Sequence, residues 1–545
     1  MGQQSVVVLG GGVAGMSAAH ELVERGFDVA VYEQRSLPGG KARSIDVPDS
    51  APPGRLPLEG EHGFRFFGGF YRHVIDTMER IPYPGQAGGV AANLVETTRA
   101  EFARAGKPAI VLPDRFPRSL SDLNACRGLV DAARVGISAA EAAYFAGRLL
   151  MLLASCDERR YSEWEHLDWW SFVGAAERSA AYQQFLADGM TRRFVAAQAR
   201  EISTRTCGYI LLQLTFDFSP GRQMDRVLDG PTNDVWIDPW LTYLRGRGVR
   251  YSLDSEVKAL NCSGGRVTSV TVSRNGVPED VTADYYVAAV PLEVMRILAT
   301  DAVREAEPRL AGLDRLRTRW MNGIQFFLER DLPICHGHTV YLDSQFGLTS
   351  ISQRQFWTDV DFSKMGDSGV GGILSVDISD WETPGLLYGK PAMQLTAEEV
   401  KDEVWAQLGA HFRHNGNGLL DDVKPLGWFL DPDIVWPNPR TTMNLEPLLI
   451  NTVGSWDLRP DAVTAIENLF LASDYVRTYT DLATMEGANE AARRAVNGIL
   501  DAAGSNAERC GVWPLREPAV FAPLRWLDRL RFKQGLPAEL PMKGT

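Results

Sequence analysis

The chain has 545 residues, of which 45% are hydrophobic and 23% are charged, which excludes a disordered or fibrous protein. Asp and Glu outnumber Lys and Arg by 69 to 56, so the net charge of −13 excludes the basic footprint that nucleic-acid binding needs. The six cysteines have no paired spacing, which is typical of a reducing cytoplasm. With no signal-peptide pattern and no long uncharged apolar stretch, we expect a cytoplasmic protein without a transmembrane segment.

Residues 5–33 have the pattern of a strand, a helix and a second strand. Residues 6–9 are a continuous apolar run, as expected for a parallel strand buried on both faces. Residues 16–25 have helical periodicity, and residues 29–32 are again apolar. Between the first strand and the helix, three glycines follow G-x-G-x-x-G spacing: Gly10, Gly12 and Gly15. This βαβ unit predicts a dinucleotide-binding loop.

The chemistry of this unit favours FAD or NAD over NADP. Gly10 permits the tight turn, Gly12 lets the backbone approach a pyrophosphate, and Gly15 lets the helix pack closely against the strand. The helix N-terminus directs free N–H groups and a positive dipole toward the phosphates. Glu33 ends the second strand, where a carboxylate accepts hydrogen bonds from ribose hydroxyls and repels a 2′-phosphate.

A second glycine-containing segment favours FAD over NAD. In RSLPGGKARS, residues 35–44, Gly39 and Gly40 precede Lys41 and Arg43. Glycines allow a close approach of the backbone to a flat or anionic ligand, and an arginine forms charge-assisted hydrogen bonds to phosphate. An ordinary NAD domain has no need of such an element directly after its second strand.

Residues 468–500 supply a third element of the predicted FAD site. A strand-like run is followed by Asp474, which can bind ribityl or other hydroxyls. An alanine-rich helix begins near Met485, and its positive end can face the flavin pyrimidine edge, where negative charge develops on reduction. Strand patterns also occur at 250–260, 266–272 and 285–290, with a hairpin signal at Gly264 and Gly265.

The predicted nucleotide-binding elements thus occupy separated blocks, and the intervening residues must build a second, interleaved domain. The sequence predicts an α/β flavoprotein with a Rossmann-like FAD-binding domain and a substrate domain of mixed sheet and helices. A C-terminal tail has an amphipathic pattern over 521–532, which suits either a helix docked on the body or an interfacial membrane helix. The expected divisions are 1–74, 236–300 and 457–505 for FAD; 75–235 and 301–456 for substrate; and 506–545 for the tail.

These motifs resemble the FAD-dependent superfamily of amine oxidases, carotenoid desaturases and protoporphyrinogen oxidase. Ser473 departs from the glycine that usually precedes the acid in that superfamily. Carried over residue by residue, the resemblance implies non-covalent FAD held by the following set: Gly10, Gly12, Val13, Ala14, Gly15, Glu33, Gln34, Gly39, Gly40, Lys41, Arg43, Gly60, His62, Gly63, Phe64, Arg65, Val257, Val290, Asp474, Thr484, Met485, Glu486 and Ala488.

Within the superfamily, GEHGFRFFGGFYRH at 60–73 resembles plant-type phytoene and zeta-carotene desaturases and hydroxysqualene dehydroxylases. Arg65 stands where those enzymes have histidine, and we expect it to act electrostatically near the flavin ring. Residues 320–329 and 346–353 resemble their substrate-side strands. The catalytic candidates are Arg65, Trp320, Gln325 and Trp456.

The resemblance implies a desaturase or dehydrogenase that removes hydride from, or adds it to, carbon of a lipophilic, isoprenoid or carotenoid-like substrate. Many large apolar residues of the intervening segments can line a long tunnel, or can simply form core. The electron acceptor would be oxygen or a quinone, and the amphipathic tail would allow peripheral contact with a membrane. No cysteine lies between Cys335 and Cys510, which disfavours a covalent flavin thioether near Asp474.

The alternative is a flavin amine oxidase that releases hydrogen peroxide. Two sequence features disfavour it: residues 319–330 contain no lysine, and Thr484 stands where many amine oxidases place an aromatic wall for the amine. A third hypothesis is a lipid-binding or regulatory protein with a purely structural flavin. A colourless preparation that takes up no FAD would favour it, whereas a yellow protein bleached by an oxidisable lipid would exclude it.

Histidines near a cysteine are candidate metal ligands. Cys335, His336 and His338 form C-H-G-H, and His411 and His414 lie three apart, but no further residue completes a four-ligand set. We therefore predict no metal site and expect these histidines in loops and on helix surfaces.

Overall fold

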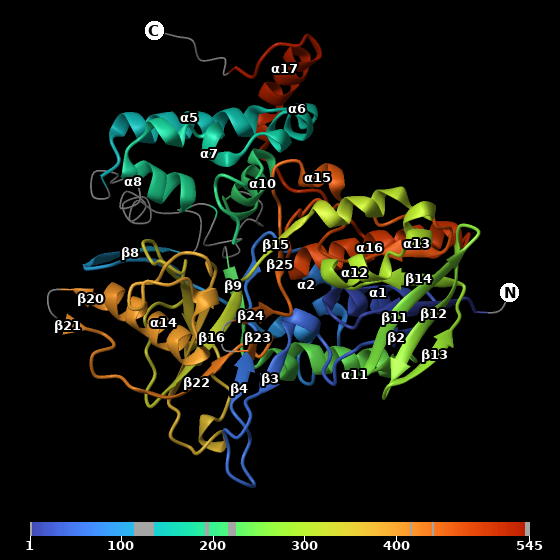
Figure 1. The fold of residues 1–545 in the computed structure, drawn as a ribbon, viewed down its shortest axis with the longest axis horizontal. Helices are drawn as coiled ribbons and strands as arrows, with labels where there is room; N and C mark the ends of the chain where they lie inside the picture. The colour runs from blue at the N-terminus through green and yellow to red at the C-terminus, as the bar shows by residue number, and fades with distance from the viewer. Residues whose placement is uncertain are drawn as a thin grey trace.

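The computed structural model describes residues 3–113, 136–189, 191, 196–215, 225–414, 417–438 and 441–539. A five-stranded parallel sheet, in the order β10-β2-β1-β14-β26, forms its nucleotide-binding part (Figure 1). Its strands are β1 (Ser5–Leu9), β2 (Asp28–Tyr32), β10 (Arg250–Ser252), β14 (Tyr285–Ala288) and β26 (Leu469–Leu471). Blocks that are hundreds of residues apart therefore form one sheet, which confirms the predicted α/β fold.

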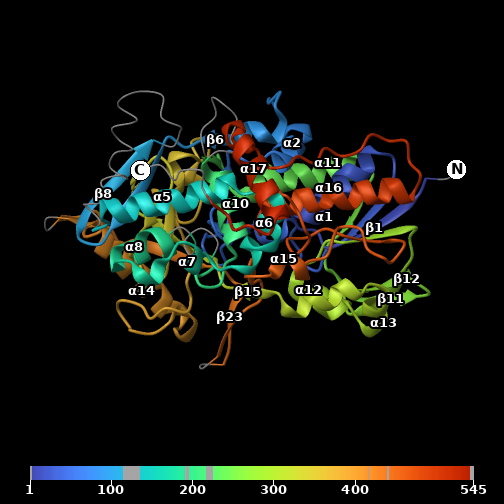
Figure 2. The same cartoon turned by 90° about the horizontal axis from the view of Figure 1, so that it is seen from above.

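Two helices from opposite ends of the chain pack together beside this sheet. α1 (Val13–Glu24) lies against α16 (Met485–Ala502), as Figure 2 shows, and α16 also contacts β26 and α2 (His73–Arg80). Both helices bury small side chains completely, among them Ala18, Ala19, Ala491 and Ala492, so that their backbones can lie close together. α11 (Asp238–Gly246) contacts α1 and β10.

An antiparallel three-stranded sheet follows β10 in the chain. It comprises β11 (Ser255–Ser263), β12 (Arg266–Arg274) and β13 (Val277–Val281). Gly264 and Gly265 form the predicted hairpin turn, with φ of 60° and 76°. α12 (Leu292–Leu298) and α13 (Asp301–Ala306) contact β11.

The second large sheet has seven strands in the order β22-β16-β19-β18-β17-β7-β8. They are β7 (Arg99–Arg104), β8 (Lys107–Pro113), β16 (Asn322–Leu328), β17 (Thr339–Tyr341), β18 (Thr349–Ser352), β19 (Gly372–Ile378) and β22 (Pro425–Leu430). Every residue of β16 and β19 is buried, and α14 (Ala397–Phe412) packs against β22 and β7. All seven strands come from residues 75–235 and 301–456.

The described residues also form short sheets. Two-stranded pairs are β3 (Ser44–Asp46) with β4 (Glu59–Glu61), β15 (Arg317–Arg319) with β25 (Leu448–Ile450), and β23 (Ile434–Asn438) with β24 (Thr441–Asn444). β5 (Phe67–Gly68) and β6 (Leu94–Glu96) pair with β9 (Asp225–Leu228), and β20 (Arg413–His414) pairs with β21 (Asn417–Gly418).

A helical layer lies beyond both sheets, at the top of Figure 1. It contains α5 (Ala139–Ala154), α6 (Asp157–Ser162), α7 (Trp169–Phe172), α8 (Ala180–Tyr182), α10 (Thr204–Thr215), α15 (Ser455–Leu458) and α17 (Ala522–Lys533). In the described part of the chain, no single helix is both long and apolar enough to cross a bilayer. Ala139–Ala154 and Asp157–His166 together reach that length and composition, but they meet at 110°.

The tail helix α17 is docked on α5 and α6, as the first of the two alternatives predicted. Its Asp528 is buried, accepting hydrogen bonds from the backbone N–H of Cys156 (2.9 Å) and from Nε of Arg159 (3.0 Å). Its outer side still exposes apolar residues, since Trp526 is 57% and Leu527 is 44% exposed.

Candidate flavin and substrate site

A cavity of about 1210 Å³ runs between the two large sheets. Its lining comes from the glycine loops and α16 on one side, and from α5, α10, β7, β8 and β17 on the other. The volume exceeds the ~300–1,000 Å³ typical of a small-molecule site. The cavity therefore has room for a dinucleotide together with a second ligand.

The glycine loops form a cradle at one end of this cavity. Gly10 has φ of 99°, which a residue with a side chain rarely adopts, and a Cβ on Gly15 would stand 1.9 Å from the carbonyl oxygen of Gly10. A Cβ on Gly40 would lie 2.9 Å from the Cα of Gly12, so the two loops touch through backbone alone. No side chain caps the N-terminus of α1 at Gly12, so its first N–H groups remain available for a pyrophosphate.

Glu33 lies at the predicted ribose position, where it also holds the loop in shape. Its carboxylate accepts hydrogen bonds from the backbone N–H groups of Gly11 (2.7 Å) and Arg35 (2.9 Å). Burial raises the pKa of Glu33 despite these two hydrogen bonds. The hydroxyl of Tyr251 donates to the carbonyl of Gly11 at 2.7 Å, so β10 also supports the loop.

Most of the residues predicted to hold FAD lie around the cavity. Thr484 caps α16, because its hydroxyl accepts a hydrogen bond from the N–H of Gly487 at 3.1 Å. The predicted residues in the lining are Gly10, Gly12, Val13, Ala14, Glu33, Gln34, Gly39, Gly40, Lys41, His62, Gly63, Phe64, Arg65, Val257, Val290, Asp474, Thr484, Met485 and Ala488; Ser473 lines it as well. This cradle fits a dinucleotide, although four predicted residues lie outside the lining.

Gly15 and Gly60 are packing positions rather than lining positions. Gly15 allows the contact of α1 with the β1 loop, as described above, which is the packing role predicted for it. A side chain on Gly60 would meet the ring of Phe429 at 2.4 Å, so glycine there lets β4 lie against the seven-stranded sheet.

Arg43 and Glu486 form buried structural contacts outside the cavity lining. The guanidinium of Arg43 is 2% exposed and forms ion pairs with Asp433 and Glu446, so the phosphate role expected for it stays a prediction. The carboxylate of Glu486 accepts hydrogen bonds from the backbone N–H groups of residues 72–74 at the start of α2, and it pairs with the ring of His73. Its negative charge thus stabilises a helix N-terminus.

Three of the four catalytic candidates lie away from the cavity lining. Trp320 packs edge-on against Trp381 in the core around the seven-stranded sheet. The amide of Gln325 is 1% exposed, accepts from the N–H of Glu61 and donates to Ser375. The ring of Trp456 lies beneath three guanidinium groups, those of Arg205, Arg459 and Arg477. The structure therefore places these three candidates in packing and hydrogen-bonding positions outside the cavity lining.

Arg65 does line the cavity, at the junction of its two halves. Its Nη1 donates to the carbonyl of Lys41 (3.1 Å), and its Nε lies 3.3 Å from the carboxylate of Glu61. The side chain is 11% exposed, so it is not a surface ion pair. It joins the segment after β2 to the segment that contacts the second sheet.

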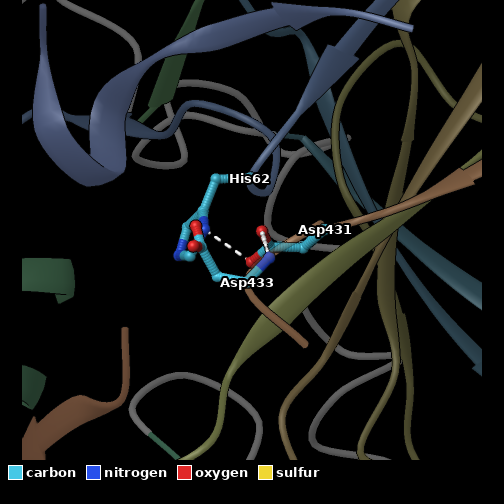
Figure 3. A group of neighbouring side chains, drawn as sticks. All are labelled: His62, Asp431 and Asp433. Atoms are coloured by element: carbon cyan, nitrogen blue, oxygen red, sulfur yellow. Dashed lines mark hydrogen bonds and ion pairs between the residues drawn. The ribbon is translucent and has the colours of Figure 1, made fainter. Parts of the chain in front are cut away.

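His62, Asp431 and Asp433 form a compact group beside this junction (Figure 3). Nδ1 of His62 lies 2.6 Å from Oδ2 of Asp431, and the three ligand-type atoms fall within 4.8 Å of one another. Asp433 is already paired with the guanidinium groups of Arg35 and Arg43, whose positive charges oppose a metal cation at this position. We interpret the group as a buried ion-pair network.

Asp225, His338 and Asp377 line the cavity, and neither aspartate was predicted from the sequence. Asp225 pairs with Nδ1 of His338, whose ring centroid lies 4.8 Å from that of Phe64. His338 was expected in a surface loop, but its side chain is only 13% exposed. A signal for Asp377 was present, because it interrupts the apolar run GILSVDI of a wholly buried strand.

His411 corrects a second surface expectation. It is buried on α14, and its Nε2 lies 2.8 Å from the carboxylate of Asp343. His336 lies against the ring of Phe356, and the side chain of His414 lies outside the described part.

The half of the cavity away from the glycine loops is apolar. Of the aromatic residues considered for a tunnel, Phe64, Phe66, Phe70 and Tyr71 line it, whereas others such as Trp169 and Phe327 are core. Aliphatic residues supply most of the remainder, including Ile110, Leu112, Ile137, Leu149, Leu152, Leu153, Leu186, Ile202, Ile210, Leu211, Leu212, Val340, Leu342, Leu449 and Ile450.

Comparisons with known proteins agree with this geometry. The zeta-carotene desaturase of Synechocystis is 24% identical over 91% of this chain and 97% of its own length, and that of Capsicum annuum is 25% identical over 91% and 81%. The structure of cyclohexylamine oxidase from Brevibacterium oxydans matches with a TM-score of 0.59 at 12% identity, over 92% of this chain and all of that chain. The model of flavin-containing amine oxidoreductases matches residues 13–500. The chain therefore belongs to the flavin-containing amine oxidoreductase family, and it is a flavin-dependent oxidoreductase.

Proposed function

We propose that the protein is an FAD-dependent desaturase or dehydrogenase that acts on carbon of a long, lipophilic substrate, isoprenoid or carotenoid-like in class. The observation that carries the proposal is the single cavity that joins the glycine cradle to a lobe lined by aliphatic side chains. An apolar lobe of this kind binds a ligand through buried hydrocarbon surface and offers few polar groups for orientation. The zeta-carotene desaturases to which the chain is similar support the same substrate class.

The cofactor would be bound without a covalent link. Gly12, Gly39, Gly40 and the N-terminus of α1 would hold the pyrophosphate, and Glu33 the ribose. The N-terminus of α16 at Met485 would face the flavin ring, which supplies hydride acceptance when bound. No cysteine occurs among the described residues of the lining, which is consistent with non-covalent binding.

An amine oxidase remains the second candidate, because the cavity contains carboxylates. Asp225 and Asp377 are both buried in the lining, and a buried carboxylate can hold an alkylammonium group. Against this candidate, β16 has no lysine and Thr484 is used as a helix cap. A peroxide assay over a panel of primary and secondary amines separates the two, and robust turnover there would favour the amine oxidase.

The first prediction tests the substrate class. We expect the purified, FAD-loaded protein to be yellow, and its flavin to be bleached anaerobically by a linear polyene or its more saturated precursor presented in liposomes. Leu211→Trp should slow that bleaching at least ~10-fold with unchanged flavin content, since an indole fills space in the apolar lobe. Leu419→Trp, at a 42% exposed site away from the lining, is the matched control and should behave like wild type.

Bleaching by amines and not by polyenes would overturn the proposal. Equal rates for Leu211→Trp and Leu419→Trp would show that the substrate does not enter this lobe. The reoxidation step identifies the acceptor: we propose oxygen or a quinone, and stopped-flow reoxidation with each distinguishes them.

The second prediction concerns location. We propose a cytoplasmic protein that contacts a membrane surface through α17, whose Trp526, Leu527 and Leu530 are 57%, 44% and 40% exposed. Trp526→Ser with Leu530→Ser should lower co-sedimentation with phospholipid vesicles by roughly 10-fold, because apolar area no longer enters the interface. Val277→Ser, at a 66% exposed position of β13, is the control; equal sedimentation of both variants would contradict this contact.

A further inference from the structure

We infer that Asp377 is the proton-accepting residue of the reaction, which rests on the proposed function. Forming a double bond from two adjacent CH groups breaks one C–H bond with its electron pair, which leaves as hydride and reduces the flavin by two electrons. The C–H bond on the neighbouring carbon also breaks, and its electron pair becomes the new carbon–carbon bond. The proton that remains needs a base in an apolar cavity, and a carboxylate oxygen of Asp377 is positioned to take it.

The position of Asp377 in the fold places its carboxylate at the junction of the cavity. It lies on β19, in register with Gly323 of β16 and Thr349 of β18. A Cβ on Gly63 would stand 2.7 Å from Oδ1 of Asp377, so glycine at 63 is what allows the carboxylate to reach this point. Gly63 and Thr349 both line the same cavity as Asp377.

The hydrogen bonding of Asp377 leaves one oxygen available. The backbone N–H of Phe64 donates to the carboxylate, while Oδ1 is buried and has no hydrogen-bond partner among the described residues. A buried carboxylate oxygen without a donor is costly in a purely structural role, because nothing replaces its hydration. A proton released by the substrate would give Oδ1 of Asp377 the partner that it lacks.

The charges that face Asp377 keep it ionised near neutral pH. Burial raises its pKa from the ordinary 3.8 to about 6, and the side chains of Arg65, His62 and His338 oppose the rise. Each of these side chains has a carboxylate partner: Glu61 for Arg65, Asp431 for His62, and Asp225 for His338. The opposing strands contribute Gly323 and Thr349, which carry no charge. The group is therefore mostly a base at pH 7 and an acid below pH 6.

Asp225 also has a buried oxygen, Oδ1, without a hydrogen-bond partner among the described residues, but it fills this role less well than Asp377. One of its oxygens is paired with Nδ1 of His338, and this pair sits against Phe64 and Phe66, at ring distances of 4.8 and 5.7 Å. A proton accepted by Asp225 would break that ion pair. His338 of this pair instead acts electrostatically on Asp377 and lowers its pKa.

The test uses Asp377→Asn, which keeps the volume of the side chain, in the FAD-loaded full chain. With wild type, we expect anaerobic single-turnover bleaching by the polyene to accelerate as the pH rises through about 6, because deprotonation creates the base. Asp377→Asn should be slower by ~10²–10⁴-fold and lose that pH dependence, with flavin content and substrate Kd unchanged. Asp377→Glu should recover a titrating rate.

A second readout does not depend on turnover. Infrared difference spectra of the substrate-free holoprotein should show a protonated carboxyl band that grows as the pH falls through about 6, and Asp377→Asn should lack that component. Asp229 is the matched control, because burial raises its pKa to about 6 while it lies outside the cavity lining. Asp229→Asn should remove its own component of the band and leave the bleaching rate unchanged.

Failure of the role of Asp377 and failure of the proposed function give different results. Wild-type bleaching rates and pH profile in Asp377→Asn, with the polyene still oxidised, would overturn the role of Asp377 and leave the proposed function standing. A wild-type flavin that no polyene bleaches would remove the proposed function and the proton step with it.

Discussion

Gly15→Ala is expected to abolish flavin binding, raising the Kd for FAD at least ~100-fold, which corresponds to about 2.7 kcal/mol. The added Cβ would stand 1.9 Å from the carbonyl oxygen of Gly10, about 1 Å closer than any such contact in proteins. The neighbouring atoms are backbone, so neither can rotate away, and α1 must move off the β1 loop. That movement misdirects the N–H groups at the start of α1, on which pyrophosphate binding depends. The measurement is flavin fluorescence titration of the apoprotein.

A second glycine substitution separates this effect from helix propensity. Gly409→Ala changes a residue of α14 around which nothing lies within 4 Å, so it should stabilise the protein by ~0.5–1 kcal/mol and bind FAD normally. Gly15→Ala should instead lower the free energy of unfolding, since overpacking typically costs ~1–3 kcal/mol. Normal FAD affinity in Gly15→Ala would show that the cradle is not the dinucleotide site.

Arg205→Met is expected to lower the free energy of unfolding by ~3–5 kcal/mol, the largest stability effect of a single substitution considered for this chain. The guanidinium lies between Glu165 (2.8 Å) and Asp481 (2.7 Å), and all three side chains are 0% exposed. Methionine fills a similar volume but leaves both carboxylates with fewer partners in a medium where charge is poorly solvated. The measurement is urea or guanidinium unfolding followed by intrinsic fluorescence.

Loss of this ion cluster should also disturb the cavity, because Arg205 and Asp481 lie on or next to elements that border it. Arg205 is on α10, which lines the substrate lobe, while Asp481 precedes the Thr484 cap of α16. The matched control is Arg250→Met, whose pair with Asp28 is 60% and 36% exposed and should contribute under ~1 kcal/mol. Equal losses in the two variants would contradict the buried-cluster argument.

The first glycine loop and its two flanking strands could be predicted from the sequence, because they depend only on residues close together in the chain. Gly10, Gly12 and Gly15 act through their own backbone, and the apolar runs of β1 and β2 define strands without reference to the rest of the chain. Arg43 is the opposite case, because its ion pairs could not be predicted from its neighbours in the sequence. Its partners Asp433 and Glu446 are some 400 residues away in sequence, and only the assembled fold shows that its charge is already neutralised.

The substrate side was harder to predict because core and cavity have the same composition. Trp320 and Trp456 are large and apolar, as cavity walls are, but they fill space against Trp381 and beneath arginines. Asp377 was overlooked because its strand lies in a segment considered only for its apolar character. A charged residue inside a fully buried strand was the available signal.

The order of strands in the parallel sheet has a consequence for biosynthesis. β26 and α16 complete the cofactor side, yet they are made only after residue 468, while β1 emerges from the ribosome first. From the synthesis of β14 until that of β26, the nascent chain therefore exposes an unpaired β14 edge and an unfinished cradle. We expect a nascent chain stalled before β26 to retain no flavin, because the strand and helix that complete the cofactor side are missing.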